Sequence, residues 1–328
     1  MAIKSMKVLN IMAFHQKELD LQFGDGINIL IGENGMGKTT LLKMIYAALQ
    51  YSIENQTSGK ELIHFFSNNL RDFSQMKYPG KEKDTCYYEI SDGQHFFKDY
   101  LTKENGIVSE GWKGLNIQSV FIPTTEMLSH SKGFLAMNQK YNMPFDETQI
   151  DIIVNASLPE TRKVSQSCEI ILKEISEVIN GKVVQEDDTF YIVKNDGRKI
   201  DFSLEAEGMR KLGLLWKLIR NGLLEKDSVL LWDEPEANLN PELYPLVANI
   251  LLALQKNGVQ IFLATHSYNF AKYLEIRRTE KEQVLIHNLY RNDSGKEIMS
   301  VSAYKMEDLE PNHIMMADNQ LLDEVYNM

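Results

Sequence analysis

A glycine-rich stretch near the N-terminus constrains this chain more than any other part of its sequence. It reads GENGMGKT from Gly32 to Thr39 and follows the stretch INILI at residues 27–31, in which Ile27, Ile29, Leu30 and Ile31 are apolar. Glycines at this spacing let backbone N–H groups turn inward around phosphates. The segment from Thr40 to about Leu49 has helical apolar periodicity, and its positive N-terminal end would face the same anion. The sequence therefore predicts a phosphate-binding loop between a buried strand and a helix.

Each residue of this loop has an expected role. Backbone N–H groups would surround the phosphates, Lys38 would contact the β- and γ-phosphates, and the Thr39 hydroxyl would ligate Mg²⁺. A nucleoside triphosphate with Mg²⁺ is therefore the expected ligand. The residues of the loop predicted to bind it are Gly32, Glu33, Asn34, Gly35, Gly37, Lys38, Thr39 and Thr40.

A second apolar run, residues 229–232, ends in the adjacent carboxylates Asp233 and Glu234. Like charges at the end of a buried strand are costly unless a cation or strong donors lie opposite. Mg²⁺ and Lys38 would supply that positive charge. We expect Asp233 to hold the Mg²⁺ next to Thr39, and Glu234 to polarise the water that attacks the γ-phosphate.

Composition narrows the classes of function. The 328 residues include 35 Lys and Arg against 46 Asp and Glu, a formal net charge of −11. This charge argues against broad binding to nucleic acid or anionic membranes, although a local basic patch would permit it. No segment resembles a signal peptide or reaches the roughly 18 apolar residues of a membrane span. The two cysteines, Cys86 and Cys168, are expected to be reduced thiols of a cytoplasmic protein.

Several phrases around these motifs resemble the ABC-type ATPases of the SMC, RecF and OLD group. Within that group the chain is similar to the small stand-alone AAA-family ATPases of bacterial defence modules. Lys38 and Asp233 lie 195 residues apart, as expected where a lid interrupts the ATPase core. The phrase from Met6 onward resembles the first antiparallel hairpin of the group, DEPEANLNP at 233–241 resembles its Walker B motif and D-loop, and GVQIFLATHSYNF at 258–270 resembles its next strand.

The resemblance implies ATP as the nucleotide and further site residues. His266, after the last of these strands, would be the switch histidine that contacts the γ-phosphate. The segment 202–224 would hold the signature helix, where Gly208 and Arg210 would bind the ATP of a second chain. The usual Ser-x-Gly reads Ala206-Glu207-Gly208 here, so the hydroxyl is absent, and backbone N–H groups with Arg210 or Lys211 would have to serve. An ordinary core helix with a basic start is the alternative.

We predict an α/β fold, a P-loop NTPase of ABC-ATPase type with an inserted helical lid. The head would comprise residues 1–124 and 183–328, and the lid residues 125–182. In the lid, Ser157 is the expected cap of a helix that has Pro159 near its start.

Two further segments have expected structures. Residues 51–115 read as β-rich, with an Asp-Gly turn at 92–93 and an Asn-Gly turn at 105–106. Residues 117–128 read as a strand, a break at Pro123 and a helix. The resemblance would bring Thr124, Thr125 and Glu126 near the Mg²⁺, without fixing a Q-loop residue.

The expected function is that of an ATPase, a phosphoanhydride hydrolase that forms a head-to-tail homodimer, or a higher assembly, around two nucleotides. By resemblance it would control a separate effector, a nuclease or toxin, in an anti-phage or toxin–antitoxin module, and could reach nucleic acid through that complex. A RecF-like repair ATPase that clamps DNA, a transporter subunit and an ATP-locked scaffold remain alternatives. The sequence does not identify the effector, its trigger or the kind of nucleic acid.

Overall fold

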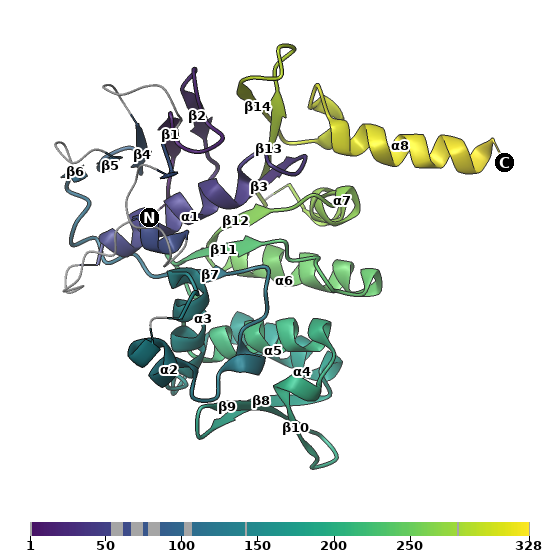
Figure 1. Cartoon of the computed structure of the whole chain (residues 1–328). Helices are drawn as coiled ribbons and strands as arrows, with labels where there is room; N and C mark the ends of the chain where they lie inside the picture. Colours follow the sequence, from purple (N-terminus) through teal and green to yellow (C-terminus); the bar gives the residue numbers. More distant parts are fainter. Residues whose placement is uncertain are drawn as a thin grey trace.

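A six-stranded sheet lies at the centre of the protein (Figure 1). The structure is a computed structural model, and it describes residues 2–53, 62–66, 75–77, 86–101, 107–141, 143–280 and 282–327. The strand order is β14-β13-β3-β12-β11-β7. All pairs are parallel except β13–β14. The strands are β3 (Ile27–Gly32), β7 (Ser119–Ile122), β11 (Val229–Asp233), β12 (Gln260–Ala264), β13 (Val284–Arg291) and β14 (Ile298–Ala303).

A second, antiparallel sheet has the order β2-β1-β4-β5-β6. Helix α1 (Lys38–Tyr51) shares one hydrophobic core with this sheet and with one face of the central sheet. The strands are β1 (Ser5–Leu9), β2 (Leu19–Gln22), β4 (Tyr87–Ser91), β5 (Phe96–Tyr100) and β6 (Ile107–Glu110). The predicted hairpin is confirmed, because β1 pairs with β2 and the side chains of β2 alternate between buried and exposed.

The β-rich prediction for residues 51–115 is confirmed where the structure describes them. Residues 92–93 lie in the connection between β4 and β5, as predicted. The Asn-Gly turn expected at 105–106 lies outside the described residues.

The other face of the central sheet is covered by helices and a small sheet of order β10-β9-β8. One continuous core joins these elements to the central sheet, so the insertion has no core of its own. The elements are α2 (Phe134–Tyr141), α3 (Glu147–Ser157), α4 (Gln166–Val178), β8 (Gly181–Glu186), β9 (Thr189–Lys194), β10 (Lys199–Asp201) and α5 (Glu207–Arg220). The lid boundaries at 125 and 182 stay a prediction.

The predicted helix cap at Ser157 is wrong. Ser157 ends α3, which Asp146 caps, and the next helix begins only after Ser165, whose hydroxyl accepts from the Cys168 N–H. Pro159 explains the difference, since a proline disfavours helical backbone at the residue before it, and Leu158 is extended.

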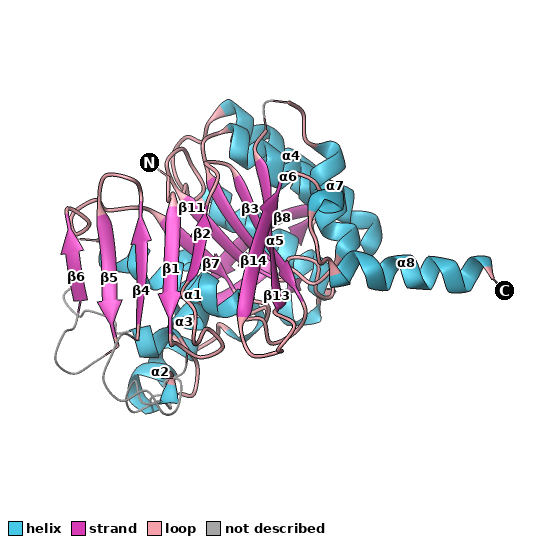
Figure 2. Cartoon of the chain, turned by 90° about the horizontal axis from the view of Figure 1, so that it is seen from above, coloured by secondary structure: helices cyan, strands magenta, loops and turns pink. Residues whose placement is uncertain are grey.

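Three more helices complete the fold: α6 (Tyr244–Lys256), α7 (Tyr268–Arg277) and α8 (His313–Tyr326). Figure 2 shows α8 projecting away from the rest of the chain. Short 3-10 turns occur at Leu62–Phe65, Leu128–His130, Phe202–Leu204, Pro241–Leu243 and Met306–Asp308. In the described part of the chain no helix has the length and apolar character needed to cross a bilayer.

Candidate functional site

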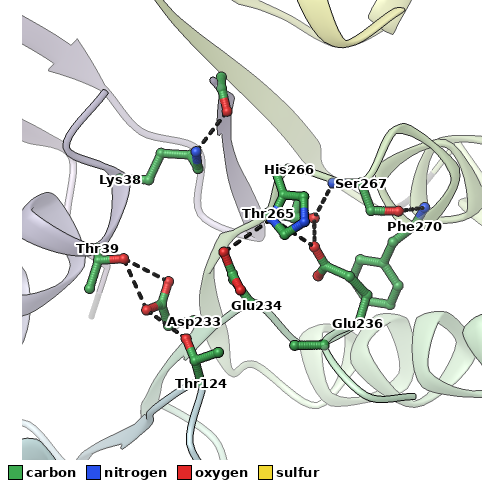
Figure 3. Close-up of polar contacts among 12 residues, drawn as sticks. Lys38, Thr39, Thr124, Asp233, Glu234, Glu236, Thr265, His266, Ser267 and Phe270 are labelled. Atoms are coloured by element: carbon green, nitrogen blue, oxygen red, sulfur yellow. Dashed lines mark hydrogen bonds and ion pairs between the residues drawn. The ribbon is translucent and has the colours of Figure 1, made fainter. Parts of the chain in front are cut away.

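The site lies where four parallel strands of the central sheet end. The phosphate loop follows β3, Asp233 ends β11, His266 follows β12, and Thr124 follows β7. Because the carboxyl ends of parallel strands meet at one edge, residues far apart in sequence come together there, as Figure 3 shows.

The phosphate loop has the backbone geometry that its glycines predict. Gly35 and Gly37 have φ of 80° and 81°, in the left-handed region that only glycine adopts freely. Gly37 caps α1, so the helix begins at Lys38, two residues before the expected Thr40. The first helical N–H groups therefore belong to the loop and face the position of a bound phosphate.

The ammonium group of Lys38 lies inside this loop. Its Nζ donates to the carbonyl oxygens of Gly32, at 2.6 Å, and Glu33, at 3.0 Å. Burial lowers the pKa of Lys38, while the nearby carboxylates, Glu234 and Asp233 foremost, oppose the shift. A desolvated cation held among carbonyls suits a multiply charged phosphate.

Asp233 accepts hydrogen bonds from two threonine hydroxyls. Thr39 Oγ1 lies 3.0 and 2.9 Å from the two carboxylate oxygens, and Thr124 Oγ1 lies 3.0 Å from Oδ2. Burial raises the pKa of Asp233, and these hydroxyls counteract the rise. Carboxylate and hydroxyl oxygens match the preference of Mg²⁺, which keeps several waters and phosphate oxygens as its other ligands. Among the described residues, no cluster of three or more His, Cys, Asp or Glu forms an all-protein metal site.

Glu234 and His266 form a pair at the open side of the site. His266 Nδ1 lies 3.0 Å from Glu234 Oε1, and the two side chains are 50% and 28% exposed respectively. Glu234 has φ 49°, a conformation rare for residues other than glycine, and its N–H donates to the Ala264 carbonyl. The turn therefore directs the carboxylate away from the core toward a position that water can reach.

Sequence reasoning missed a second acid in this turn. Glu236 is 5% exposed and accepts a hydrogen bond from Thr265 Oγ1 at 2.5 Å, and its other oxygen has no hydrogen-bond partner among the described residues. His266 Nδ1 lies 3.9 Å from Glu236. Burial raises the pKa of Glu236. Nothing in the local sequence shows that Thr265, which is distant along the chain, supplies its donor.

The predicted signature helix is α5, with Ala206 as its cap. A side chain at Gly208 would meet Leu239, whose Cδ1 would lie 3.2 Å from the added Cβ, so α5 starts closely packed on the D-loop. Arg210 does not point freely outward, because its Nη1 lies 3.2 Å from the buried carboxylate of Glu126. Glu126, which was expected near the Mg²⁺, pairs with Arg210 instead.

Lys211 is not available to a phosphate of a second chain, contrary to the alternative that the sequence left open. Its side chain is 3% exposed, and its Nζ donates to the carbonyls of Ala237, at 2.5 Å, and Glu234, at 3.3 Å. Lys211 thus links α5 to the turn that carries Glu234.

An open cavity of 480 Å³ lies beside the phosphate loop. Glu33, Asn34 and His266 line one side, and His313 and Ile314 of α8 line the other. The helix that projects from the molecule therefore starts next to the candidate site.

Comparisons with known structures identify the fold that carries this site. The SMC head domain from Thermotoga maritima superimposes with a TM-score of 0.53 at 16% identity, covering 92% of this chain and 99% of that one. The Smc head domain with an extended coiled coil from Pyrococcus furiosus gives a TM-score of 0.52 at 12% identity, covering 99% of both chains. The chain therefore has the fold of an SMC- and ABC-type P-loop ATPase head. The predicted fold class is thereby confirmed.

Matches to relatives by sequence cover less of this chain. The DNA replication and repair protein RecF of Streptococcus uberis is 28% identical over 262 residues, 78% of this chain and 67% of that protein. RecF of Clostridium kluyveri is 32% identical over 122 residues. These residues make up 37% of this chain and only 28% of that protein. Residues 130–271 match the family described as "AAA domain, putative AbiEii toxin, Type IV TA system".

Proposed function

We propose that this chain is an ABC-type ATPase that binds ATP·Mg²⁺, closes as a head-to-tail dimer around two nucleotides, and hydrolyses them to control a separate effector, a nuclease or toxin. The convergence of Lys38, Thr39, Asp233, Glu234 and His266 from three strand ends supports the nucleotide chemistry most directly. The effector role is supported by the toxin–antitoxin name of the matching family.

In this proposal Lys38 and the loop N–H groups hold the β- and γ-phosphates, and Thr39 and Asp233 hold Mg²⁺, with Thr124 positioning the Asp233 carboxylate. The metal would neutralise charge on the phosphate oxygens. Glu234 accepts a proton from water as the water oxygen bonds to the γ-phosphorus. The bond from that phosphorus to the bridging oxygen breaks, and ADP and phosphate leave. His266, held by Glu234, is placed to donate to the γ-phosphate.

The start of α5 is the surface offered to the ATP of a second copy. Its cap has no side-chain hydrogen bond, so the first backbone N–H groups of the helix remain suited to an anion. Arg210, tied to Glu126, positions this turn and would reach a phosphate only by exchanging that ion pair.

A RecF-like DNA clamp is the second candidate. The alignment with the RecF protein of Streptococcus uberis over 78% of this chain favours it. The net charge of −11 weighs against it, because DNA binding is dominated by contacts of basic residues with phosphates.

The first test compares Glu234→Gln with Lys38→Ala and with Glu242→Gln, an exposed carboxylate of the adjoining turn. Phosphate release should fall by about a hundredfold or more in Glu234→Gln with ATP affinity retained, and should be unchanged in Glu242→Gln. Lys38→Ala should lose ATP affinity. Normal turnover in Glu234→Gln would exclude Glu234 as the base.

The effector is tested by isolating tagged Glu234→Gln protein from its native host in ATP·Mg²⁺ and identifying bound proteins by mass spectrometry. A nuclease or toxin that is absent from the Lys38→Ala sample would support effector control. Recovery of DNA and repair proteins alone would favour the RecF-like function, and a membrane permease would contradict both.

A further inference from the structure

The C-terminal helix α8 presents an apolar surface that nothing in the described part of the chain covers. None of its 14 residues is buried. Large apolar side chains along it are more than 45% exposed, although a single chain gains nothing by ordering such a helix in water. These side chains are Met316, Leu321, Leu322, Val325 and Tyr326.

The position of α8 indicates which partner it can contact. Its first turns line the same open cavity as Glu33, Asn34 and His266, beside the phosphate loop. Figures 1 and 2 show the rest of the helix extending away from the body of the molecule. A second copy seated over the phosphate loop, as in the proposed dimer on which this inference rests, would therefore lie alongside α8.

A groove of matching chemistry lies on the helical side of the molecule. A cavity of 500 Å³ between α4 and α5 is lined by the apolar side chains Leu172 and Trp216, by four basic side chains, Arg162, Lys163, Lys173 and Arg220, and by one acidic side chain, Glu169. Arg162, Lys163 and Lys173 are exposed.

The charge of α8 is complementary to this groove. The helix carries Asp318, Asp323 and Glu324 and has no Lys or Arg. An acidic helix fits a groove whose charged side chains are mostly basic, because charge pairing favours the complex.

Length supports the same pairing. In the proposed dimer the start of α5, near Gly208, covers the phosphate loop of the other copy. Trp216 and Arg220 lie 8 and 12 residues farther along α5, about 12 to 18 Å at 1.5 Å per residue. Helix α8 begins beside the phosphate loop and is about 21 Å long by the same rise, so it can span that distance.

We propose that α8 of each copy packs into the α4–α5 groove of a second copy and fastens the ATP-bound dimer. Twofold symmetry makes the contact twice, since each copy supplies one helix and one groove. The second copy is the occupant that the position, charge and length of α8 favour together.

The test is a charge exchange, made in the Glu234→Gln background to hold ATP. Asp323→Lys with Glu324→Lys reverses the charge at the end of α8, and Arg162→Glu with Lys163→Glu reverses the charge at the edge of the groove. Sedimentation velocity in ATP·Mg²⁺ should show that either reversal raises the dimer Kd about tenfold or more. Combining both reversals in one chain should restore the Kd to within about threefold of the starting protein. A control of equal charge change, Asp20→Lys with Glu225→Lys, should leave the Kd unchanged.

Fluorescent-nucleotide titration of every variant separates this inference from the proposed function. An unchanged dimer Kd in either charge-reversed variant, or no recovery of the Kd when both reversals are combined, would overturn the inference about α8. A starting protein that binds ATP yet stays monomeric would overturn it while leaving the nucleotide site intact. If reversing α8 spares the dimer but releases a co-purifying effector, α8 docks on that effector instead.

Discussion

Glu234 sits in a strained backbone conformation that its surroundings hold in place. Its φ of 49° is unfavourable for a side chain with a Cβ, and such residues persist where neighbouring contacts over-determine them. Here the Ala264 carbonyl accepts from its N–H, and Lys211 donates to its carbonyl. The backbone conformation sets the direction in which the Glu234 side chain leaves the turn, and the contact with His266 Nδ1 holds its carboxylate.

His287 gives a residue-scale prediction about pH. It is fully buried, Nδ1 lies 2.7 Å from Ser302 Oγ, Nε2 lies 3.3 Å from Asn28 Oδ1, and burial lowers its pKa to about 4. The unfolded chain, with an ordinary histidine pKa near 6.5, binds the proton first as pH falls. The stability due to the neutral ring is therefore complete above about pH 6.5, and up to about 3 kcal/mol is lost by pH 4.

Urea denaturation of wild type and His287→Gln at pH 7 and at about pH 4.5 measures the stability that depends on the neutral His287 ring. The carboxylates are the same in both proteins, so the difference between the two pH dependences of the unfolding free energy isolates the contribution of His287. The wild type should lose more stability on acidification than the variant does. Parallel losses would contradict the prediction.

At the scale of elements, α5 and the turn after β11 form one unit. Lys211 donates to two carbonyls of that turn, Asn238 Nδ2 donates to Glu207 at 2.9 Å, and Gly208 packs closely against Leu239. These contacts join the start of α5 to the turn that carries Glu234, and we expect a displacement of one to move the other.

Lys211→Met tests this connection. Without the ammonium group the two carbonyls lose a buried donor, and the Glu234 turn should relax. We expect kcat for ATP hydrolysis to fall about tenfold or more with a smaller change in KM, because orientation of the base is lost rather than substrate binding.

Lys217→Met is the matched control. Lys217 lies on the same helix, is 5% exposed and contacts Glu160, far from the turn. Both variants should lose about 1–3 kcal/mol of folding stability, but only Lys211→Met should lose turnover. An equal fall of kcat in the two variants would show that general destabilisation is the cause.

The elements also show what the sequence could and could not predict. Apolar periodicity and the glycine pattern predicted β3, the phosphate loop and β11, because those signals are local. The helix cap was misplaced at Ser157 because two nearby serines offer the same local signal, and only Pro159 with the packing of α3 decides between them. The roles of Lys211 and Glu236 depend on partners distant along the chain, which no local pattern reveals.

For the whole molecule, β3 joins the two hydrophobic cores. Ile27, Ile29 and Ile31 belong to the core on the helical side, and Leu30 belongs to the core around α1. Adjacent strand residues face opposite sides of a sheet, so neither core is complete without this strand.

This arrangement predicts one cooperative unfolding transition. Trp112 reports on the core around α1, and Trp216 reports on the other core. With Trp232→Phe as background, Trp216→Phe and Trp112→Phe leave one reporter each. Within each variant, the urea midpoint from tryptophan fluorescence should coincide with the midpoint from far-UV circular dichroism, as two-state unfolding requires. Midpoints of the two probes that differ by more than about 0.5 M within one variant would show that the two sides unfold separately.

The strand order also has a consequence for the synthesis of the protein. The hydrogen-bonding neighbours of β3 are β12 and β13, which the ribosome makes long after the phosphate loop has emerged. At about 5–20 residues per second, β3 waits roughly ten seconds or more for its first neighbour. During that interval β3, which is apolar except for Asn28, has both edges open, so the nascent chain is a natural client for a chaperone. Truncated products that end before Gln260 carry the nucleotide motif without the sheet that gives it shape.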